Sequence, residues 1–427
     1  MKRIFRLSCR YTLYIILFPA IAFGNGFAIN EQSARAAGMG GAFVAQADSP
    51  SAVYYNPAGI TQLKETQIST GFGLFVPKAS FESSVDDPII KTHAGKTTDL
   101  EDTVYFAPNL FGTHKITSQW STGIGIFSPF GLGTNWPDDW EGRYTIGGTE
   151  TKLKSISINP VAAFRPGKRF SFSAGPILQY IDITLKNKQN LFPVSQMDAD
   201  SKLEGDNWAW GLNAGLLFWI SDNLKAGASY RSGIIHKITG GKLIVTGIPA
   251  ALGGNVITGA SADLKLPSIL SLGAAWSIRS LTMEFDAQWT EWSTYNTLKV
   301  IPDNGQIIST TTDWNNVWAY RFGSQYRLNE YLDLRGGIVF DESPIPDKTL
   351  GPLVPFGDRW LFSLGAGIHY QNFTVDIVYT YVDDEDRIWN NEAGNYNTLI
   401  SSATGRVVGE FKDVNTHIFG INVSYRF

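Results

Sequence analysis

The feature that most constrains this chain is an alternation of apolar and polar residues with a period of two, repeated many times after residue 65. In the segment that ends the chain, every second residue is apolar or aromatic: Phe419, Ile421, Val423, Tyr425 and Phe427. Successive side chains of a β-strand point to opposite faces, so this pattern predicts a strand with one apolar and one polar face. The same pattern recurs in 359–370 and 372–383, which predicts a protein built of such strands.

The composition of the two faces distinguishes a membrane barrel from a soluble sandwich. The polar face consists of Gly, Ser, Thr and scattered charges, and the apolar face is rich in aromatic residues, which suits a polar lumen and a lipid-facing surface. Charged residues make up only 17% of the chain, whereas an average soluble domain carries about 25%. After the first 24 residues, no apolar run approaches the ~20 residues that a membrane-spanning helix needs. We therefore expect the chain to cross a membrane with strands.

Short and long connections alternate along the predicted strands. Very short links such as 166–168 and 371–372 alternate with longer segments such as 77–102 and 236–263, as the periplasmic turns and outer loops of outer-membrane barrels do. The sequence predicts an all-β fold, an antiparallel transmembrane β-barrel of about fourteen strands that spans residues 65–427. We expect strands at 66–76, 103–113, 119–127, 151–165, 169–186, 206–220, 224–235, 264–278, 281–300, 314–327, 331–341, 359–370, 372–383 and 411–427.

Both ends of the chain carry export features. Residues 1–24 combine basic residues, an apolar run from 11 to 22 and small residues before Asn25, which is typical of a cleaved signal peptide. The one cysteine, Cys9, lies within this segment, so we expect a mature chain without disulfides. A terminal aromatic residue on an alternating strand, here Phe427, is typical of the signal read by the barrel-assembly machinery. We therefore expect an outer-membrane protein of a Gram-negative cell, surrounded by outer-membrane lipid.

No pattern favours catalysis, a cofactor or a metal. The five histidines are spread over predicted loops and strands, and no G-x-S-x-G motif is present. No histidine spacing suggests a metal site. We therefore expect no enzyme and no cofactor, with a phospholipase-type activity as the weakest alternative. The net charge of −4 argues against a nucleic-acid partner.

Residues 25–64 do not continue the alternation. They are rich in Gly and Ala and precede the first predicted strand, so they form either a compact plug inside the barrel or a periplasmic tail. Strand parity assigns several charged residues to the lumen: Glu284, Asp286, Arg321, Arg335 and Asp376. Charges of both signs in a narrow lumen should pair with one another or with a plug. The alternative for these residues is direct contact with a ligand.

An ordered series of motifs runs through the mature chain. It begins with residues 25–33, of sequence NGFAINEQS, and with Asn56-Pro57-Ala58. Its later members are Ser128-Pro129-Phe130-Gly131-Leu132-Gly133, Trp140-Glu141-Gly142-Arg143-Tyr144, Leu266-Pro267, Trp289-Thr290-Glu291-Trp292-Ser293 and Phe340-Asp341-Glu342-Ser343-Pro344-Ile345-Pro346. The series resembles the FadL/TodX-type outer-membrane transporters, a family that takes up long-chain fatty acids and, in related members, aromatic hydrocarbons. In this family an N-terminal hatch closes the barrel, and Asn56, Pro57 and Ala58 match its hatch motif.

The resemblance implies passive, gated uptake of hydrophobic molecules, most of all long-chain fatty acids, by a monomeric barrel. The hatch, here 25–64, would rearrange, and the ligand would leave sideways beside a kinked third strand. The matching kink is Ser128-Pro129-Phe130-Gly131, where Pro removes a ladder donor and Gly tolerates a bend. Phe27 matches a hatch aromatic that reaches the ligand pocket. Lys186 or Lys188 matches a cation that would bind a carboxylate.

One departure from the family leaves the ligand open. Residues 310–312 are all threonine, where the family has a second basic residue on strand ten. This weakens the assignment to fatty acids and leaves aromatic hydrocarbons or alkanes as alternatives. A surface adhesin or phage receptor is the alternative from another class, and changes at Asn56 or Pro57 would then leave the activity intact.

Overall fold

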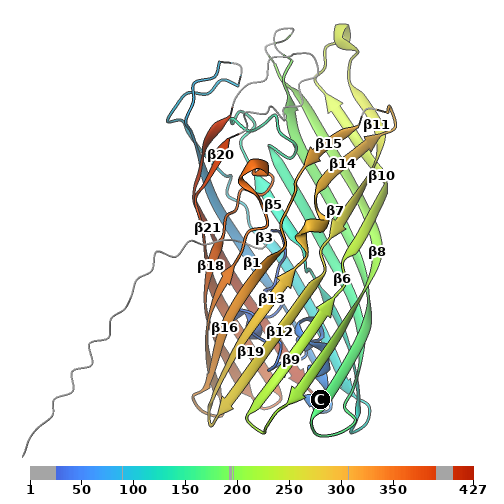
Figure 1. Ribbon diagram of the computed structural model, residues 1–427, viewed down its shortest axis with the longest axis vertical. Helices are drawn as coiled ribbons and strands as arrows, with labels where there is room; N and C mark the ends of the chain where they lie inside the picture. Colours follow the sequence, from blue (N-terminus) through green and yellow to red (C-terminus); the bar gives the residue numbers. More distant parts are fainter. Residues whose placement is uncertain (1–25, 89, 192–194, 196, 306, 391–406) are drawn as a thin grey trace, which may run out of the picture.

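The wall of the molecule is a closed β-barrel with short turns at one end and longer segments at the other (Figure 1). The computed structural model describes residues 26–427 except 89, 192–194, 196, 306 and 391–406, so the expected signal peptide 1–24 lies outside the described residues. No helix in the described part of the chain has the length and apolar character to cross a membrane.

The predicted all-β barrel is confirmed, with fourteen antiparallel strands in the described residues. It closes where the last strand pairs with the first, from Gln67 opposite Arg426 to Ser83 opposite Gly409. Seven of the fourteen are single elements: β1 (Thr66–Ser83), β6 (Glu150–Phe164), β7 (Phe170–Gln189), β8 (Ala199–Trp219), β17 (Leu332–Asp341), β18 (Arg359–Tyr370) and β21 (Val408–Arg426). The other strands are interrupted, each being two elements in line: β2 (Thr97–Asp99) and β3 (Tyr105–Lys115), β4 (Trp120–Phe127) and β5 (Gly131–Asn135), β9 (Leu224–Arg231) and β10 (Ile234–Thr246), β11 (Val256–Leu266) and β12 (Ile269–Ile278), β13 (Leu281–Thr290) and β14 (Thr297–Pro302), β15 (Ile308–Thr311) and β16 (Val317–Arg327), and β19 (Phe373–Asp384) and β20 (Arg387–Asn390).

The alternation read from the sequence matches the two faces of the wall. In β21, Phe419 and Val423 are 48% and 40% exposed on the lipid side, whereas Asn422 is 2% exposed on the lumen side. Several strands extend further outward than we expected, since β1 reaches Ser83 and much of 236–263 is a hairpin rather than a loop. Beyond the lipid both faces of a strand meet water or loops, so the alternation fades while backbone pairing continues.

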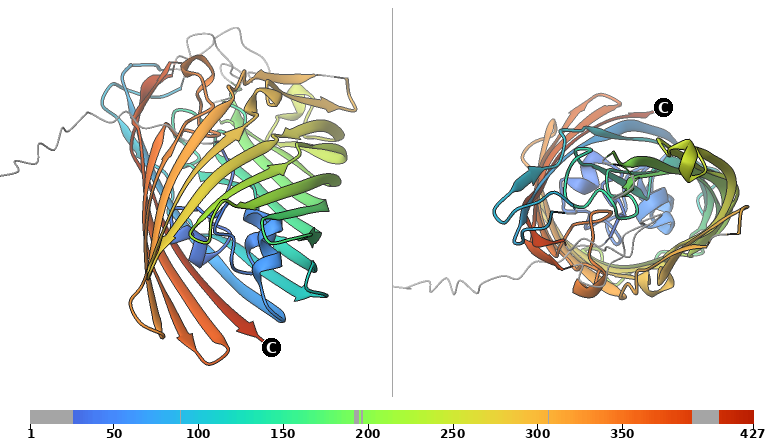
Figure 2. Two further views of the ribbon diagram at one scale, coloured as in Figure 1. Left: turned by 60° about the horizontal axis from the view of Figure 1, so that its bottom comes forward. Right: turned by 90° about the horizontal axis from the view of Figure 1, so that it is seen from above.

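Residues 26–63 lie inside the barrel, drawn in blue in Figure 2. They form α1 (Ala34–Ala37), α2 (Ala52–Tyr55) and the 3-10 helix η1 (Pro57–Gln62). Small residues let this segment approach the wall, since a Cβ on Gly38 would stand 3.2 Å from the Cα of Gly365. Of the two interpretations of this segment, the structure therefore places it within the lumen. Short 3-10 helices outside it are η2 (Ala250–Leu252), η3 (Trp292–Thr294) and η4 (Asp347–Thr349).

Candidate functional site

The wall is interrupted on the outer half of the third strand. β4 pairs with β3 only as far as Ile126 opposite Leu110, and β5 then pairs with β6 alone. The stretch Tyr105–Asn109 of β3 pairs with β1 on one side, and no pairing on its other side occurs in the described residues. Pro108 and Pro129 border this break, and a proline cannot donate to a ladder. We refer to this gap between β3 and β5 as the wall opening, and the predicted kink 128–131 lies at it.

The lumen segment supplies hydrogen bonds that the wall lacks at this opening. The N–H of Ile29 donates to the carbonyl of Pro129 (2.9 Å), and the N–H of Gly131 donates to the carbonyl of Phe27 (3.0 Å). These are antiparallel bridge contacts between the lumen segment and the kink. Backbone polar groups in a membrane must be satisfied within the protein. The start of the lumen segment thus completes the edge of the interrupted strand.

Two side chains complete the kink from either side. The buried amide of Gln32 donates to the carbonyl of Ser128 (2.7 Å) and accepts from its N–H (3.2 Å). The hydroxyl of Ser155, on β6, accepts from the N–H of Phe130 (3.0 Å) and donates to its carbonyl. Both side chains therefore take the place of a neighbouring strand. Gln32 was not singled out from the sequence, because only the folded chain places it beside Ser128.

A cavity of about 570 Å³ passes through the wall opening. On the lumen side it is lined by Phe27, Ile29, Phe356, Arg359, Leu361 and Ile418. On the lipid side it reaches Val104, Phe106 and Ile156, which are 60%, 61% and 40% exposed. Most of this lining is apolar, so the cavity offers an apolar molecule a route from the lumen to the lipid.

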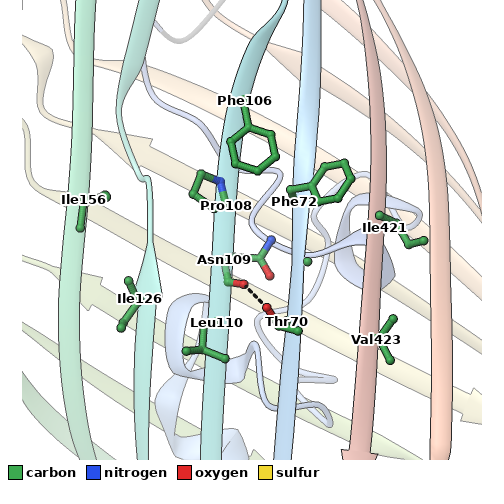
Figure 3. Close-up of a pocket in the computed structure, with 11 residues that line it drawn as sticks. Thr70, Phe72, Phe106, Pro108, Asn109, Leu110, Ile126, Ile156, Ile421 and Val423 are labelled. Atoms are coloured by element: carbon green, nitrogen blue, oxygen red, sulfur yellow. Dashed lines mark hydrogen bonds between the residues drawn. The ribbon is translucent and has the colours of Figure 1, made fainter.

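A second hollow of about 550 Å³, which we call the outer groove, continues from this cavity on the lipid-facing surface (Figure 3). Phe106, Pro108 and Ile156 line both hollows. The rest of the groove is formed mainly by Phe72, Leu110, Ile126, Ile421 and Val423. The cavity and the outer groove therefore form one continuous apolar surface across the wall.

Phe27 closes the lumen end of the cavity inside a cage of aromatic rings. It is 4% exposed, and its ring centroid lies 4.7 Å from Trp292, 5.7 Å from Trp314, 6.0 Å from Tyr295 and 6.1 Å from Phe130. The structure thus brings Phe27 and the kink residue Phe130 together at the cavity. Aromatic contacts of this kind contribute about 0.5–1.5 kcal/mol each beyond burial. An apolar ligand of similar size would compete with the Phe27 ring for the cage.

Neither Lys186 nor Lys188 lines the cavity, contrary to the expectation of a ligand cation at these positions. Both stand on the outer face of β7, because the alternate residues of that strand point inward. Lys186 pairs with Glu150, and Lys188 pairs with Asp138 (2.8 Å) and Asp200 (2.6 Å). The cations that do line the cavity are Lys152, Lys154 and Arg359. The alternating Lys152-Leu153-Lys154 indicates in the sequence that both lysines share one face of a strand, but only the fold places that face beside the kink.

Asn56 of the hatch motif joins the lumen segment to the wall. Its buried amide donates to the carbonyls of Val44 (2.7 Å) and Leu216 (3.0 Å), and its oxygen accepts from the N–H of Ala58 (3.2 Å). Pro57 follows at the first position of η1, where its missing N–H costs nothing. A Cβ on Gly215 would stand 2.3 Å from the Asn56 oxygen, so the motif fits closely against β8.

Glu284 and Asp286 bind four consecutive N–H groups of the lumen segment. The N–H groups of Phe43 and Val44 donate to Asp286 (2.8 and 3.1 Å). The N–H groups of residues 45 and 46 donate to Glu284 (2.6 and 2.8 Å). Both carboxylates are 1% exposed. We refer to this contact as the carboxylate latch, and it ties the middle of the lumen segment to β13.

The remaining predicted lumen charges lie on the next strands around the barrel. Arg321 donates to the carbonyl of Gly40 (3.1 Å). Arg335 pairs with Asp376 (2.6 Å) and donates to Gln325 (2.8 Å), beside Gly38. These residues therefore pair with one another or contact the lumen segment. Within the described residues, no three His, Cys, Asp or Glu side chains are placed to share a metal ion.

A buried carboxyl at the outer end of the barrel should make the stability of the protein depend on pH. Asp358, directly before β18, is 0% exposed. It accepts one bond from the N–H of Ser343 (2.9 Å), and its Oδ2 has no hydrogen-bond partner among the described residues. Burial, with a smaller contribution from the Glu385 carboxylate, raises the pKa of Asp358 to about 8.

We expect the stability of the protein to fall as the pH rises from about 4 to about 8, because the folded state retains a proton on Asp358 that the unfolded state has lost. Asp358→Asn removes this titration and should weaken the dependence. Thermal unfolding of both proteins in detergent, followed by tryptophan fluorescence at about pH 5 and pH 8, measures the difference. An equal loss of Tm in both proteins would rule out Asp358 as its source.

Comparison with known proteins gives the family of this architecture. Residues 15–427 match a family described as outer membrane protein transport protein (OMPP1/FadL/TodX). The long-chain fatty acid transport protein of Escherichia coli O6:H1 is 25% identical over 463 residues, covering 97% of each chain. The fold is similar to that of a Pseudomonas aeruginosa FadL homologue (TM-score 0.80, 22% identity, covering 94% of this chain and 100% of that one). It is also similar to that of the Pseudomonas putida toluene transporter TodX (TM-score 0.67, 16% identity, 95% and 99%). The chain therefore belongs to the OMPP1/FadL/TodX family of outer membrane transport proteins.

Proposed function

We propose that this protein takes up long-chain fatty acids by passive, gated diffusion and releases them sideways through the wall opening. The observation that carries the proposal is the apolar cavity that runs from Phe27, past the kink, to lipid-facing Phe106 and Ile156. Lateral release keeps an acyl chain out of water, where each exposed CH₂ costs about 0.8 kcal/mol. The relative from Escherichia coli is named for the transport of these acids.

In this proposal the lumen segment 26–63 acts as the hatch. A ligand arriving from the outer loops displaces the Phe27 ring from its cage. Because Phe27 and Ile29 hold the edge of the kink, movement of the start of the hatch also releases the wall opening. Ligand entry and lateral exit are coupled through the same few hydrogen bonds.

Aromatic hydrocarbons are the second candidate cargo. The cage around Phe27 consists of aromatic rings in edge and tilted contacts, and a monoaromatic ligand would reproduce those contacts. The similar structure of TodX is that of a toluene transporter. This candidate predicts that a neutral ligand needs no cation along its route.

Uptake by whole cells tests the proposal. In a strain that lacks other family members, expression of the protein is expected to raise radiolabelled oleate uptake above that of cells with an empty vector. The same cells are tested with toluene. A rise with toluene alone would transfer the assignment to hydrocarbons. If uptake of neither ligand rises, transport is contradicted. The adhesin or receptor alternative would then be favoured.

A further inference from the structure

Two lysines stand at the lipid-side edge of the wall opening. Lys152 and Lys154 lie two residues apart on β6 and both line the cavity. The register pairs Lys152 with Gly133 and Lys154 with Gly131 of β5. Paired residues of neighbouring strands share one face. The two lysines and the two glycines therefore share the face that borders the cavity, where the absence of a Cβ makes room for Ile29 beside Gly131 and for the Tyr105 ring beside Gly133.

The charge around these lysines is not fully compensated. Glu150 pairs with both Lys152 and Lys186. Lys154 is exposed and has no ion pair or hydrogen bond among the described residues. Asp182 is the register neighbour of Lys154, without an ion pair between them. The edge of the opening thus presents at least one free ammonium group to whatever fills the cavity.

The apolar part of the path begins directly beside these cations. Ile156 follows Lys154 by two residues on the same face and belongs to both the cavity and the outer groove. Figure 3 shows Ile156 and Ile126 on one side of the groove, across from Phe72 and Ile421. A single surface therefore has a cationic end and an apolar end. Its complement is a molecule with an anionic head and a long apolar tail.

The depth of this surface agrees with such a ligand. Ile156 is the register neighbour of Tyr180, which in turn lies opposite Trp208. The Tyr180 and Trp208 rings are 5.1 Å apart on the outer face of the wall. Aromatic residues of this kind mark the interface between lipid and water. The lysines lie outward of this row and the outer groove runs inward from it, so a head group would stay at the interface while its tail enters lipid.

We propose that Lys152 and Lys154 hold the carboxylate of a long-chain fatty acid at the wall opening, with its acyl chain in the outer groove. This inference rests on the proposed function and adds a head-group site to the exit. The ammonium groups donate charge-assisted hydrogen bonds to the carboxylate. The acid then leaves tail first into the outer leaflet. A neutral hydrocarbon gains nothing from these two residues.

The test compares an acid with the alcohol of the same chain. Lys152→Ala/Lys154→Ala is expected to lower oleate uptake by about tenfold or more, the size of a lost charge-assisted contact. Uptake of oleyl alcohol should not change. Lys152→Arg/Lys154→Arg should keep most oleate uptake, because the charge remains. Lys242→Ala, on the outer face of β10, is the matched control and should have no effect. Heat-modifiable migration on gels verifies that each variant folds.

A binding measurement separates this inference from the proposed function. Carbodiimide treatment of the purified protein with oleate should couple the acid to Lys154 or Lys152 more than to Lys242, as read by mass spectrometry. Wild-type cells without oleate uptake would refute the function, whereas absent coupling would refute the site. Equal losses of acid and alcohol uptake would also overturn the site. The site would also be overturned if the double alanine variant kept its oleate uptake but lost co-purified lipopolysaccharide. The lysines would then bind lipid phosphates.

Discussion

Removal of the carboxylate latch is expected to convert the closed barrel into an ion-conducting pore. In Glu284→Ala/Asp286→Ala, the four N–H groups of residues 43–46 lose their acceptors. The alanine side chains at 284 and 286 cannot accept hydrogen bonds. Water is then the acceptor that remains for these N–H groups in the lumen. The hatch should therefore leave the wall much more often than in the wild-type protein.

The size of the effect follows from the burial of the latch. Leaving a buried N–H without its acceptor costs about 1–3 kcal/mol, four such groups are affected here, and each 1.4 kcal/mol is a factor of ten in an equilibrium. The population with a detached hatch should thus rise by at least about a hundredfold. Planar lipid bilayers measure it directly, as current bursts from the variant under conditions where the wild-type protein stays closed.

A neutral substitution elsewhere on the wall serves as the control for the latch. Asp263→Asn removes one exposed carboxylate from the outer face of β11 and should leave the conductance at the wild-type level. If the latch variant stays as closed as this control, the hatch is held by its other contacts, such as those of Asn56 and Gln32. The carboxylates would then be dispensable for closure.

Filling the wall opening is expected to block uptake without unfolding the barrel. At Gly131, even a Cβ would stand 2.6 Å from Ile29, and the position lines the cavity. Gly131→Trp therefore places an indole in the path between the lumen and Phe106. Because close-packed side chains leave no room for an acyl chain, uptake of the cargo should fall by about tenfold or more.

Gly167 provides the matched control for this substitution. It lies in a short turn, and a Cβ there would meet nothing within 4 Å. Gly167→Trp adds the same indole outside the proposed path and should transport normally. Uptake by Gly131→Trp cells at the level of Gly167→Trp cells would show that the cargo does not leave through this opening. A route straight down the lumen would then have to be sought.

The barrel could be predicted because its signals are local. Apolar residues such as Phe419 and Val423 alternate with polar ones because one side of each strand faces lipid. The same alternation recurs in every strand of the wall. The break at Pro129 was predictable for the same reason, since a missing N–H affects pairing wherever the residue lies. Recognition of Phe427 by the assembly machinery and the monomeric state stay predictions.

The cations that line the cavity could not be predicted, because their position depends on how the wall bends. Lys186 and Lys188 matched a family position, yet strand parity turns them away from the cavity and onto ion pairs with Glu150, Asp138 and Asp200. Lys152 and Lys154 face the route only because β5 leaves β3 and opens the wall beside them.

The sequence by itself therefore determined the barrel, the faces of its strands and the place of the kink, since each follows from residue type and period along one strand. Only the tertiary structure decided which residues surround the opening. It set Phe27 in its aromatic cage and Gln32 on Ser128, and it tied Glu284 and Asp286 to the hatch. These contacts join residues about a hundred to more than two hundred positions apart, and closure of the barrel is the step that brings them within hydrogen-bond distance.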